Sequence, residues 1–172
     1  YYPRATGVKT GYTSAAGRCL VATAEDDGIR FLSVLCGAKT TILESGDLLM
    51  ESFPETIKLL DYGFDNYSYV TVLSPLYPID QVSVLNSAAS EAVAVAPAKD
   101  VRILLPANYN PEALRTEILL DAKEVEAPVS EGQKLGLARV YYGKEVIDET
   151  DLLVFADVAR SELSSVATTS TA

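Results

Sequence analysis

The sequence has 172 residues, 48% of them hydrophobic, and a net charge of −10 with a pI near 4.4. This length holds one domain or two small ones, and the acidic balance argues against nucleic acid as a partner, because phosphate contacts need clustered Lys and Arg. The sequence contains no histidine and only two cysteines, which excludes Ser-His-Asp and Cys-His catalysis and a zinc site within it.

An extended segment near the start of the chain combines a cation, a hydroxyl and a glycine. Residues 7–13 read Gly-Val-Lys-Thr-Gly-Tyr-Thr, a composition that favours a strand. Lys9 offers a positive charge, Thr10 offers a hydroxyl that can donate to a carboxylate, and Gly11 lets another backbone lie against the strand. The tripeptide alone is better explained as a strand end with an exposed lysine, so its longer context decides.

Two further strands follow, over residues 18–24 and 29–36. Asp27 and Gly28 separate them and favour a two-residue type I′ turn. The three strands then form an antiparallel meander with residues 8–13 at the open edge, where a substrate peptide can add as a further strand.

This turn also brings the two cysteines together. If Asp27 and Gly28 form it, the numbers of paired residues sum to 55, and Cys19 faces Cys36. They either form a cross-strand disulfide, which needs a suitable non-hydrogen-bonded pair, or are two small buried hydrophobic residues. A redox-active role is the least favoured, because nothing nearby in the sequence is placed to lower a thiol pKa.

Residues 39–51 are expected to form a loop or an inserted segment, and a helix follows them. Ser52 is its predicted N-cap, with Pro54 in the first turn and Glu55 three residues after the cap. Gly63 lies near the predicted C-cap. The apolar residues recur at helical spacing, as expected for a helix that covers the sheet: Ile57, Leu60 and Phe64.

After Asn66 the sequence changes to short runs rich in Val, Leu and Ile, punctuated by Pro, Gly and Asn, which is typical of a small all-β sandwich. The runs are 68–73, 82–85, 92–96, 101–105, 116–120, 135–142, 145–147 and 152–155. We therefore expect one unit over 1–66, a β-rich domain over 67–160, and a flexible tail over 161–172, where Ser, Thr and Ala dominate.

Residues 7–24 read Gly-Val-Lys-Thr-Gly-Tyr-Thr-Ser-Ala-Ala-Gly-Arg-Cys-Leu-Val-Ala-Thr-Ala. They closely resemble the third active-site motif of the low-molecular-mass penicillin-binding proteins, the serine-type D-alanyl-D-alanine carboxypeptidases of the S11 peptidase type. Residues 58–64 resemble the helix that closes the family's catalytic domain, and residues 100–106 and 127–133 resemble its C-terminal β domain. The resemblance implies an α+β fold: the C-terminal part of a β-lactamase/transpeptidase-like domain, followed by a small all-β sandwich.

The family's serine attacks the carbonyl between two D-alanines at the end of a peptidoglycan stem peptide. Water hydrolyses the resulting acyl-enzyme, β-lactam antibiotics stall at the acyl stage, and no cofactor takes part. On this resemblance Lys9 places positive charge near the nucleophile and the terminal carboxylate, Thr10 donates to that carboxylate, and Gly11 gives the ligand room. The backbone N–H of Tyr12 completes the oxyanion hole. Thr13 is either a substrate contact or a β-branched strand residue.

The family's other two motifs, Ser-x-x-Lys and Ser-x-Asn, do not occur in the sequence. We therefore expect the nucleophile on an N-terminal portion outside this chain. That portion is the expected partner of residues 1–66, which would otherwise expose sheet edges; pairing with another copy is the alternative.

The family often carries an arginine before the closing helix that holds the terminal carboxylate. Between Arg30 and Lys58 the only basic residue here is Lys39. Lys39 is either a point-charge substitute or a solvated loop lysine.

The resemblance implies an extracytoplasmic location in a bacterial cell envelope, on the outer face of the cytoplasmic membrane, with the anchor outside this chain. A second hypothesis is a non-catalytic envelope-binding module or pseudoenzyme. A β-lactamase fits poorly, because those enzymes normally lack an appended β domain. The presence of the two missing motifs in the parent protein separates the first hypothesis from the second.

Overall fold

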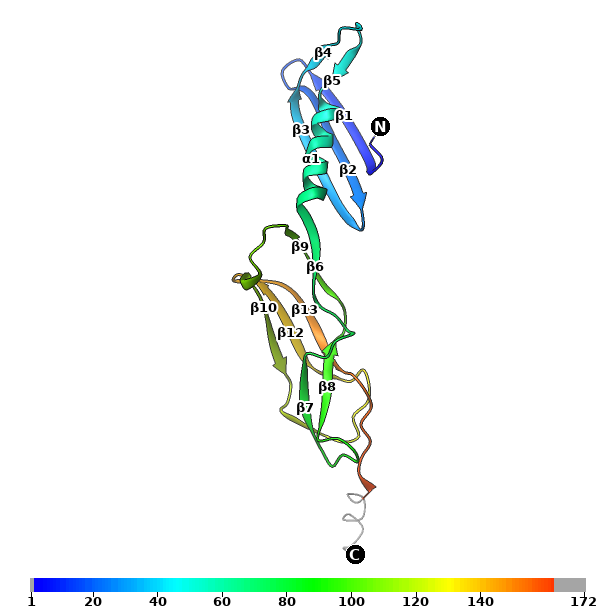
Figure 1. Ribbon diagram of the computed structural model, residues 1–172, viewed down its shortest axis with the longest axis vertical. Helices are drawn as coiled ribbons and strands as arrows, with labels where there is room; N and C mark the ends of the chain where they lie inside the picture. The colour runs from blue at the N-terminus through cyan, green and yellow to red at the C-terminus, as the bar shows by residue number, and fades with distance from the viewer. Residues whose placement is uncertain (1, 163–172) are drawn as a thin grey trace, which may run out of the picture. The chain divides into compact units, whose positions relative to one another are not determined.

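The computed structural model describes residues 2–162, which form two units (Figure 1). Unit 1 takes in the described residues up to Tyr69 together with Leu104–Asn108, and unit 2 takes in Val70–Ile103 and the described residues from Tyr109 onward. The boundaries expected from the sequence, after residues 66 and 160, stay predictions about domains that fold independently. The predicted tail lies outside the described residues from residue 163 onward.

The sheet of unit 1 is the predicted meander. Strands β1 (Ala5–Thr13), β2 (Gly17–Asp26) and β3 (Ile29–Ala38) pair antiparallel in the order β1-β2-β3, so β1 is an edge strand. Asp27 and Gly28 have φ angles of 48° and 75°. Positive φ at both central residues is what a type I′ turn requires, and the turn prediction is confirmed.

The predicted register holds over most of the β2–β3 pair and changes at the cysteines. The numbers of paired residues sum to 55 from the Leu20–Leu35 pair to the turn, but a bulge lies between Arg18 and Leu20. Both cysteines are free thiols; Cys19 is half-buried and Cys36 is exposed. The interpretation as two buried hydrophobic residues is therefore wrong, because neither side chain is covered by the packing that buries the other face of the sheet.

Residues 39–51 contain a hairpin rather than a loop. Strands β4 (Thr40–Ile42) and β5 (Leu48–Met50) pair antiparallel, and every residue in them is exposed. The prediction of a loop came from the turn-forming residues between these strands. Those residues form the turn of the hairpin, where the N–H of Leu43 donates to the carbonyl of Asp47 at 2.9 Å.

Helix α1 (Ser52–Asn66) lies across the meander (Figure 1), and its predicted ends are wrong at both termini. The N-cap is Glu51, which makes no side-chain cap bond, while Ser52 is inside the helix and buried. The helix continues past Gly63 and ends at Asn66. A Cβ on Gly63 would lie 2.9 Å from Cε2 of Phe31, so this glycine makes room for an aromatic ring and does not cap the helix.

Small residues on the sheet let the helix approach closely. Ala22 and Ala24 of β2 are buried against Leu60 of α1. Phe31 packs beside them and meets Phe64 edge to face, with ring centroids 5.0 Å apart. Such aromatic pairs stabilise a core beyond their buried area.

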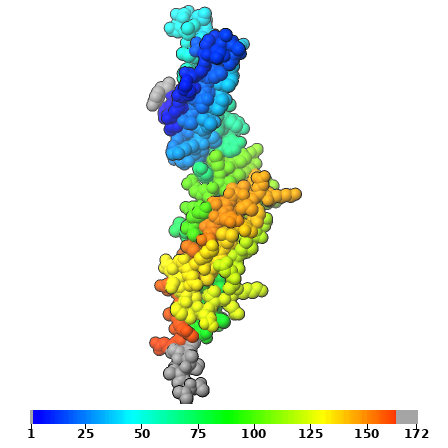
Figure 2. All heavy atoms as spheres, turned by 180° about the vertical axis from the view of Figure 1, so that it is seen from behind, coloured from blue at the N-terminus to red at the C-terminus, as the bar shows by residue number. Residues whose placement is uncertain are grey.

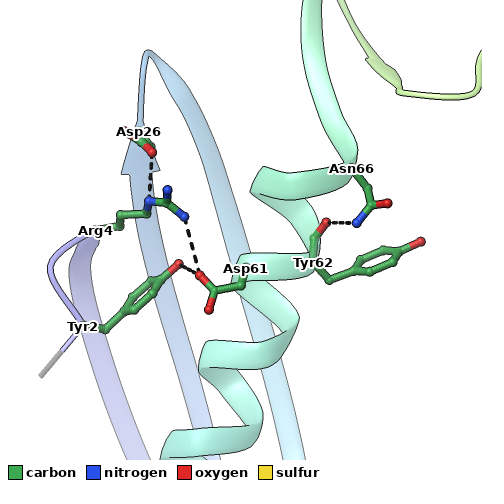
Figure 3. Close-up of polar contacts among 6 residues, drawn as sticks. All are labelled: Tyr2, Arg4, Asp26, Asp61, Tyr62 and Asn66. Atoms are coloured by element: carbon green, nitrogen blue, oxygen red, sulfur yellow. Dashed lines mark hydrogen bonds and ion pairs between the residues drawn. The ribbon is translucent and has the colours of Figure 1, made fainter.

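Polar contacts attach the start of the chain to this helix (Figure 3). The Tyr2 hydroxyl donates to Oδ1 of Asp61 at 2.7 Å, and Arg4 Nη1 lies 3.5 Å from the same oxygen. Arg4 Nε also pairs with Asp26 at 2.8 Å, at the turn end of β2. The segment before β1 is thereby fixed to both α1 and β2.

Unit 2 is all-β, as predicted. Its main sheet has six strands in the order β10-β12-β13-β8-β7-β11. β6 and β9 pair separately, and residues 67–69 of β6 and 104–106 of β9 are counted in unit 1. The bounds are β6 (Tyr67–Leu73), β7 (Asp80–Leu85), β8 (Ala92–Pro97), β9 (Val101–Pro106), β10 (Leu114–Leu120), β11 (Glu124–Glu126), β12 (Lys134–Tyr142) and β13 (Glu145–Val154), with a 3-10 turn over Pro111–Ala113. The predicted run 145–147 and residues 152–154 of the predicted run 152–155 belong to the single strand β13, because the polar residues between them continue its pairing with β12.

The strand β11 was not predicted from the sequence. It is short, pairs parallel with β7, and has only Val125 as an apolar residue. No helix among residues 2–162 has the length and apolar character needed to cross a membrane.

The core contact of unit 1 predicts a contrast between neighbouring leucines. Leu60 is 3% exposed and Leu59 is 49% exposed. We expect Leu60→Ala to lower the free energy of unfolding by about 2–5 kcal/mol, because it leaves a cavity against the sheet. The matched control Leu59→Ala should cost less than about 1 kcal/mol. Since α1 is the one α-helix among the described residues, denaturant titrations followed by circular dichroism at a helical wavelength measure the unfolding of unit 1. Equal losses of unfolding free energy for the two variants would contradict the packing of Leu60.

The Tyr2–Asp61 contact predicts a loss of stability in alkali. Burial, and next the hydrogen bond to Asp61, raise the pKa of Tyr2. The protonated Tyr2 hydroxyl therefore contributes fully to the free energy of unfolding below its pKa in the unfolded chain, about 10. This contribution is lost as pH rises through its pKa in the folded protein. Above about pH 10, wild type should lose free energy of unfolding faster than Tyr2→Phe. The control Tyr62→Phe changes an exposed tyrosine on α1, the helix that carries Asp61, and should follow wild type. If the free energy of unfolding fell equally fast with pH in all three proteins, the role of Tyr2 would be contradicted.

Candidate functional site

The five residues singled out by the sequence lie together on β1. Lys9, Thr10, Gly11, Tyr12 and Thr13 occupy the end of this strand nearest the turn to β2, and every one of them is exposed. β2 is the neighbour of β1 on one side, and no described strand pairs with its other edge. The space-filling view shows β1 lying open along the surface of unit 1 (Figure 2).

Neighbouring residues of this strand face opposite sides of the sheet. Lys9 pairs with Val21, and Thr10 pairs with Leu20, which lies on the buried face. Because side chains alternate along a strand, an extended ligand lying along the edge can meet the Lys9 ammonium on one face and the Thr10 hydroxyl on the other. The unpaired backbone of β1 lies between them and can hydrogen bond to a peptide.

The charge of Lys9 is available to a ligand. Its Nζ donates to the backbone carbonyl of Thr10 at 2.6 Å. Among residues 2–162, no carboxylate lies within ion-pair distance of it. This placement suits recognition of an anionic group.

Gly11 and Thr13 differ in what surrounds them. A Cβ at Gly11 would make an ordinary contact of 3.8 Å with Cβ of Cys19, so β2 does not require a glycine here. Thr13 accepts a hydrogen bond from the N–H of Ala16 at 3.0 Å. Its hydroxyl is therefore already engaged in the turn between β1 and β2.

An arginine missed by the sequence reasoning lies beside this strand. Arg18 pairs directly with Tyr12 across the β1–β2 ladder, and its guanidinium carbon is 5.3 Å from the centre of the Tyr12 ring. Its Nε donates to the Thr40 hydroxyl at 2.6 Å. The family pattern predicted a second cation between Arg30 and Lys58, which does not include Arg18. The tight turn after Thr13, which folds the chain back on itself, was the signal that could have identified Arg18.

Lys39, the cation in that range of the sequence, is exposed next to the start of β4. Its backbone carbonyl accepts from the N–H of Glu51 at 3.1 Å, which closes the base of the β4–β5 hairpin. The hydrogen bond between Arg18 and Thr40 attaches the same hairpin to β2. Two cations thus lie where the hairpin leaves the sheet.

An apolar cavity of about 380 Å³ opens between α1 and the β1 side of the sheet. Its lining includes Val8, Leu20, Phe53, Ile57 and Leu60. Thr56 also lines it, and its buried hydroxyl has no hydrogen-bond partner in the described structure. With no charged lining residue, the cavity suits packing against another apolar segment and not acid–base chemistry. No group of three or more Cys, Asp or Glu residues between residues 2 and 162 is arranged to hold a metal ion.

Comparison with protein families decides the assignment. The model described as "Penicillin-binding protein 5, C-terminal domain" matches residues 67–160, more than half of the chain, and the model described as "D-alanyl-D-alanine carboxypeptidase" matches residues 1–40. The chain belongs to the penicillin-binding protein 5 family of D-alanyl-D-alanine carboxypeptidases. The family expected from the Lys-Thr-Gly segment is therefore confirmed.

Individual members of the penicillin-binding protein 5 family are moderately similar to the chain. It is 26% identical over 164 residues to the D-alanyl-D-alanine carboxypeptidase DacF of Bacillus subtilis (strain 168), covering 94% of this chain and 39% of that protein. It is 30% identical over 159 residues to DacC of Escherichia coli (strain K12), covering 88% of this chain and 36% of that protein. The chain thus spans less than half the length of these relatives.

Solved structures agree with the expected α+β fold, which is confirmed. Penicillin-binding protein 5 from Haemophilus influenzae matches with a TM-score of 0.53 and 27% identity, covering 89% of this chain and 43% of that one. The D-alanyl-D-alanine carboxypeptidase DacD from Francisella tularensis matches with a TM-score of 0.50 and 29% identity, covering 93% and 37%.

Proposed function

We propose that this chain is part of a serine-type D-alanyl-D-alanine carboxypeptidase of the bacterial cell envelope, extracytoplasmic and sensitive to β-lactams. The enzyme removes the terminal D-alanine from peptidoglycan stem peptides through an acyl-enzyme. The serine nucleophile and its lysine lie on a polypeptide segment outside residues 1–172. The family assignment supports the reaction class, and the relatives are long enough to hold such a segment.

The observation that carries this proposal is the exposure of β1. It is an edge strand whose residues Lys9–Thr13 are all exposed, and it lies within residues 1–40, which match the carboxypeptidase family model. A peptide with a terminal carboxylate can add to the edge as a strand, with backbone hydrogen bonds supplying affinity and side chains supplying selectivity.

Each residue of the edge has a distinct role in the proposed reaction. Lys9 supplies positive charge beside the nucleophile and, because its long side chain brings Nζ to the backbone carbonyl of Thr10, also near the terminal carboxylate. Thr10 donates a hydrogen bond to that carboxylate, and Gly11 leaves space for the peptide. The N–H of Tyr12 stabilises the tetrahedral oxyanion, an interaction typically worth about 3–4 kcal/mol in the transition state. Thr13 positions the following turn.

Arg18 completes the carboxylate site in this proposal. A planar guanidinium can bind a carboxylate through two parallel hydrogen bonds, whereas the Lys39 ammonium acts as a point charge. Arg18 is held over the ring of Tyr12 and against Thr40, so less of its side-chain freedom is lost when a ligand binds.

The apolar cavity and the open faces of β1 support an additional segment that packs on unit 1. Val8 is 54% exposed and lines the cavity together with Leu20 and Phe53. A covering segment would remove this apolar surface from water and could offer a partner to the Thr56 hydroxyl.

Acylation by a penicillin tests the proposal. Protein from its natural source would be incubated with a penicillin and analysed by denaturing mass spectrometry. We expect the penicilloyl mass on a polypeptide that contains Ser-x-x-Lys, either continuous with residues 1–172 or co-purifying with them. Acylation within residues 1–172, or no acylated species, would contradict it; the second outcome favours a non-catalytic envelope-binding module.

In the acylating protein, Thr10→Ala should lower the second-order acylation constant roughly 10- to 100-fold, because a hydrogen bond to a charged carboxylate is worth about 1.5–3 kcal/mol. Thr6→Ala is the matched control on the same strand: its hydroxyl bonds to that of Thr23, and we expect no measurable change. Equal effects of the two substitutions would remove Thr10 from the binding site.

A carboxylate ester separates binding by Arg18 from a structural role. Arg18→Ala should slow acylation by a penicillin with a free carboxylate by about tenfold or more, and should have little effect on acylation by the methyl ester of the same penicillin. Arg18→Lys should restore only part of the rate. Arg30→Ala, at the other end of the sheet and paired with Glu25, is the control. An equal loss for both penicillins would show that Arg18 only supports the fold.

A further inference from the structure

The two cysteines meet at the irregular point of the sheet. The β2–β3 ladder pairs Arg18 with Ala38 and then Leu20 with Leu35. One residue of β2, Cys19, therefore lies opposite two residues of β3, Cys36 and Gly37. This is the arrangement of a β-bulge, in which the extra residue is released from regular pairing.

The strand pattern directs both thiols to the same face of the sheet. Val21 and Val34 are a directly opposed pair, and both are exposed. Cys19 is two residues from Val21 along β2, and Cys36 is two residues from Val34 along β3. Because side chains alternate, the two sulfurs lie on the face of these valines, opposite the face that α1 covers.

The two thiols are neighbours, and Cys19 influences the titration of Cys36. A hydrogen bond with the neighbouring Cys19 side chain raises the pKa of the Cys36 thiol. A disulfide needs Cα atoms about 4.4–6.8 Å apart, and Cys36 is one of the two β3 residues that lie opposite Cys19 in the bulge. Cys36 is exposed and Cys19 is half-buried, so an oxidant in solution can reach Cys36 first.

We propose that Cys19 and Cys36 are a modification site: a dithiol that small disulfide oxidants convert into a cross-strand disulfide. The Cys36 thiolate attacks glutathione disulfide, one sulfur of which leaves as glutathione thiolate and takes up a proton. The Cys19 thiolate then displaces the second glutathione from the mixed disulfide. In total the two cysteines lose two electrons and two protons, and glutathione disulfide is reduced to two thiols.

The dithiol is independent of the proposed carboxypeptidase activity, but it lies next to β1, the strand that carries the candidate site. Cys19 pairs directly with Gly11 of the Lys-Thr-Gly segment. A disulfide would link β2 and β3 covalently at the bulge, one strand away from the candidate site. No lowered thiol pKa is required, because proximity makes the second displacement intramolecular.

Redox titration of the 172-residue chain tests this proposal. The chain would be equilibrated in glutathione buffers, quenched with an alkylating reagent and digested with trypsin. Cleavage after Arg18, Arg30 and Lys39 places the cysteines in separate peptides, residues 19–30 and 31–39. We expect these two peptides to be joined by a disulfide, in a chain whose intact mass is lower by two hydrogens. The equilibrium constant for forming the Cys19–Cys36 disulfide from glutathione disulfide should be at least about tenfold larger than for the same chain in denaturant, where the loop between the cysteines must close by chance.

Three variants keep the result interpretable. Cys19→Ser and Cys36→Ser should each stop at a mixed disulfide with glutathione. The double variant Leu35→Cys with Cys36→Ser moves the thiol one residue, to the face of Leu20, and should lose the advantage over the denatured chain. The proposal fails if wild type accumulates separate glutathione adducts or intermolecular dimers, or if folding gives no increase in the equilibrium constant.

Discussion

Unit 1 depends on the close packing of one helix against a three-stranded sheet. The approach is possible because the contacting residues are small where the backbones come near: Ala22 and Ala24 on β2, and Gly63 on α1 beneath the ring of Phe31. Leu60 fills the space between the layers. Larger side chains at these positions would separate the helix from the sheet.

The helix leaves the other face of the sheet and most of β1 uncovered. For an ordinary domain this would be a liability, because an open edge and exposed valines and leucines invite association. The proposed binding of an extended peptide requires such an edge, since a ligand can pair only with backbone groups that have no partner. The Tyr2–Asp61 and Arg4–Asp26 contacts stabilise the strand from its N-terminal end, where they do not obstruct the edge.

The sequence predicted best those features that depend on local chemistry. Asp27 and Gly28 define their turn through backbone conformations that few other residues adopt, and the register of the meander follows from that turn. The helix ends were wrong because Ser52 and Gly63 resemble cap residues but are buried by tertiary packing. Strand β11 was missed because its parallel partner is distant in the sequence. The five residues of the candidate site are adjacent in the chain, so one strand brings them together. Arg18 was missed because its proximity to Tyr12 depends on the turn between the strands.

Lys9 also influences how copies of the chain meet one another. An exposed edge strand is a template for pairing with an identical strand, and a lysine on the edge is a common means of discouraging it, because two copies bring like charges together. The ammonium proposed to attract an anionic peptide therefore also repels a second β1. In the proposed function, removing that charge would weaken ligand binding and favour self-association together, so one side chain serves both recognition and solubility at this edge.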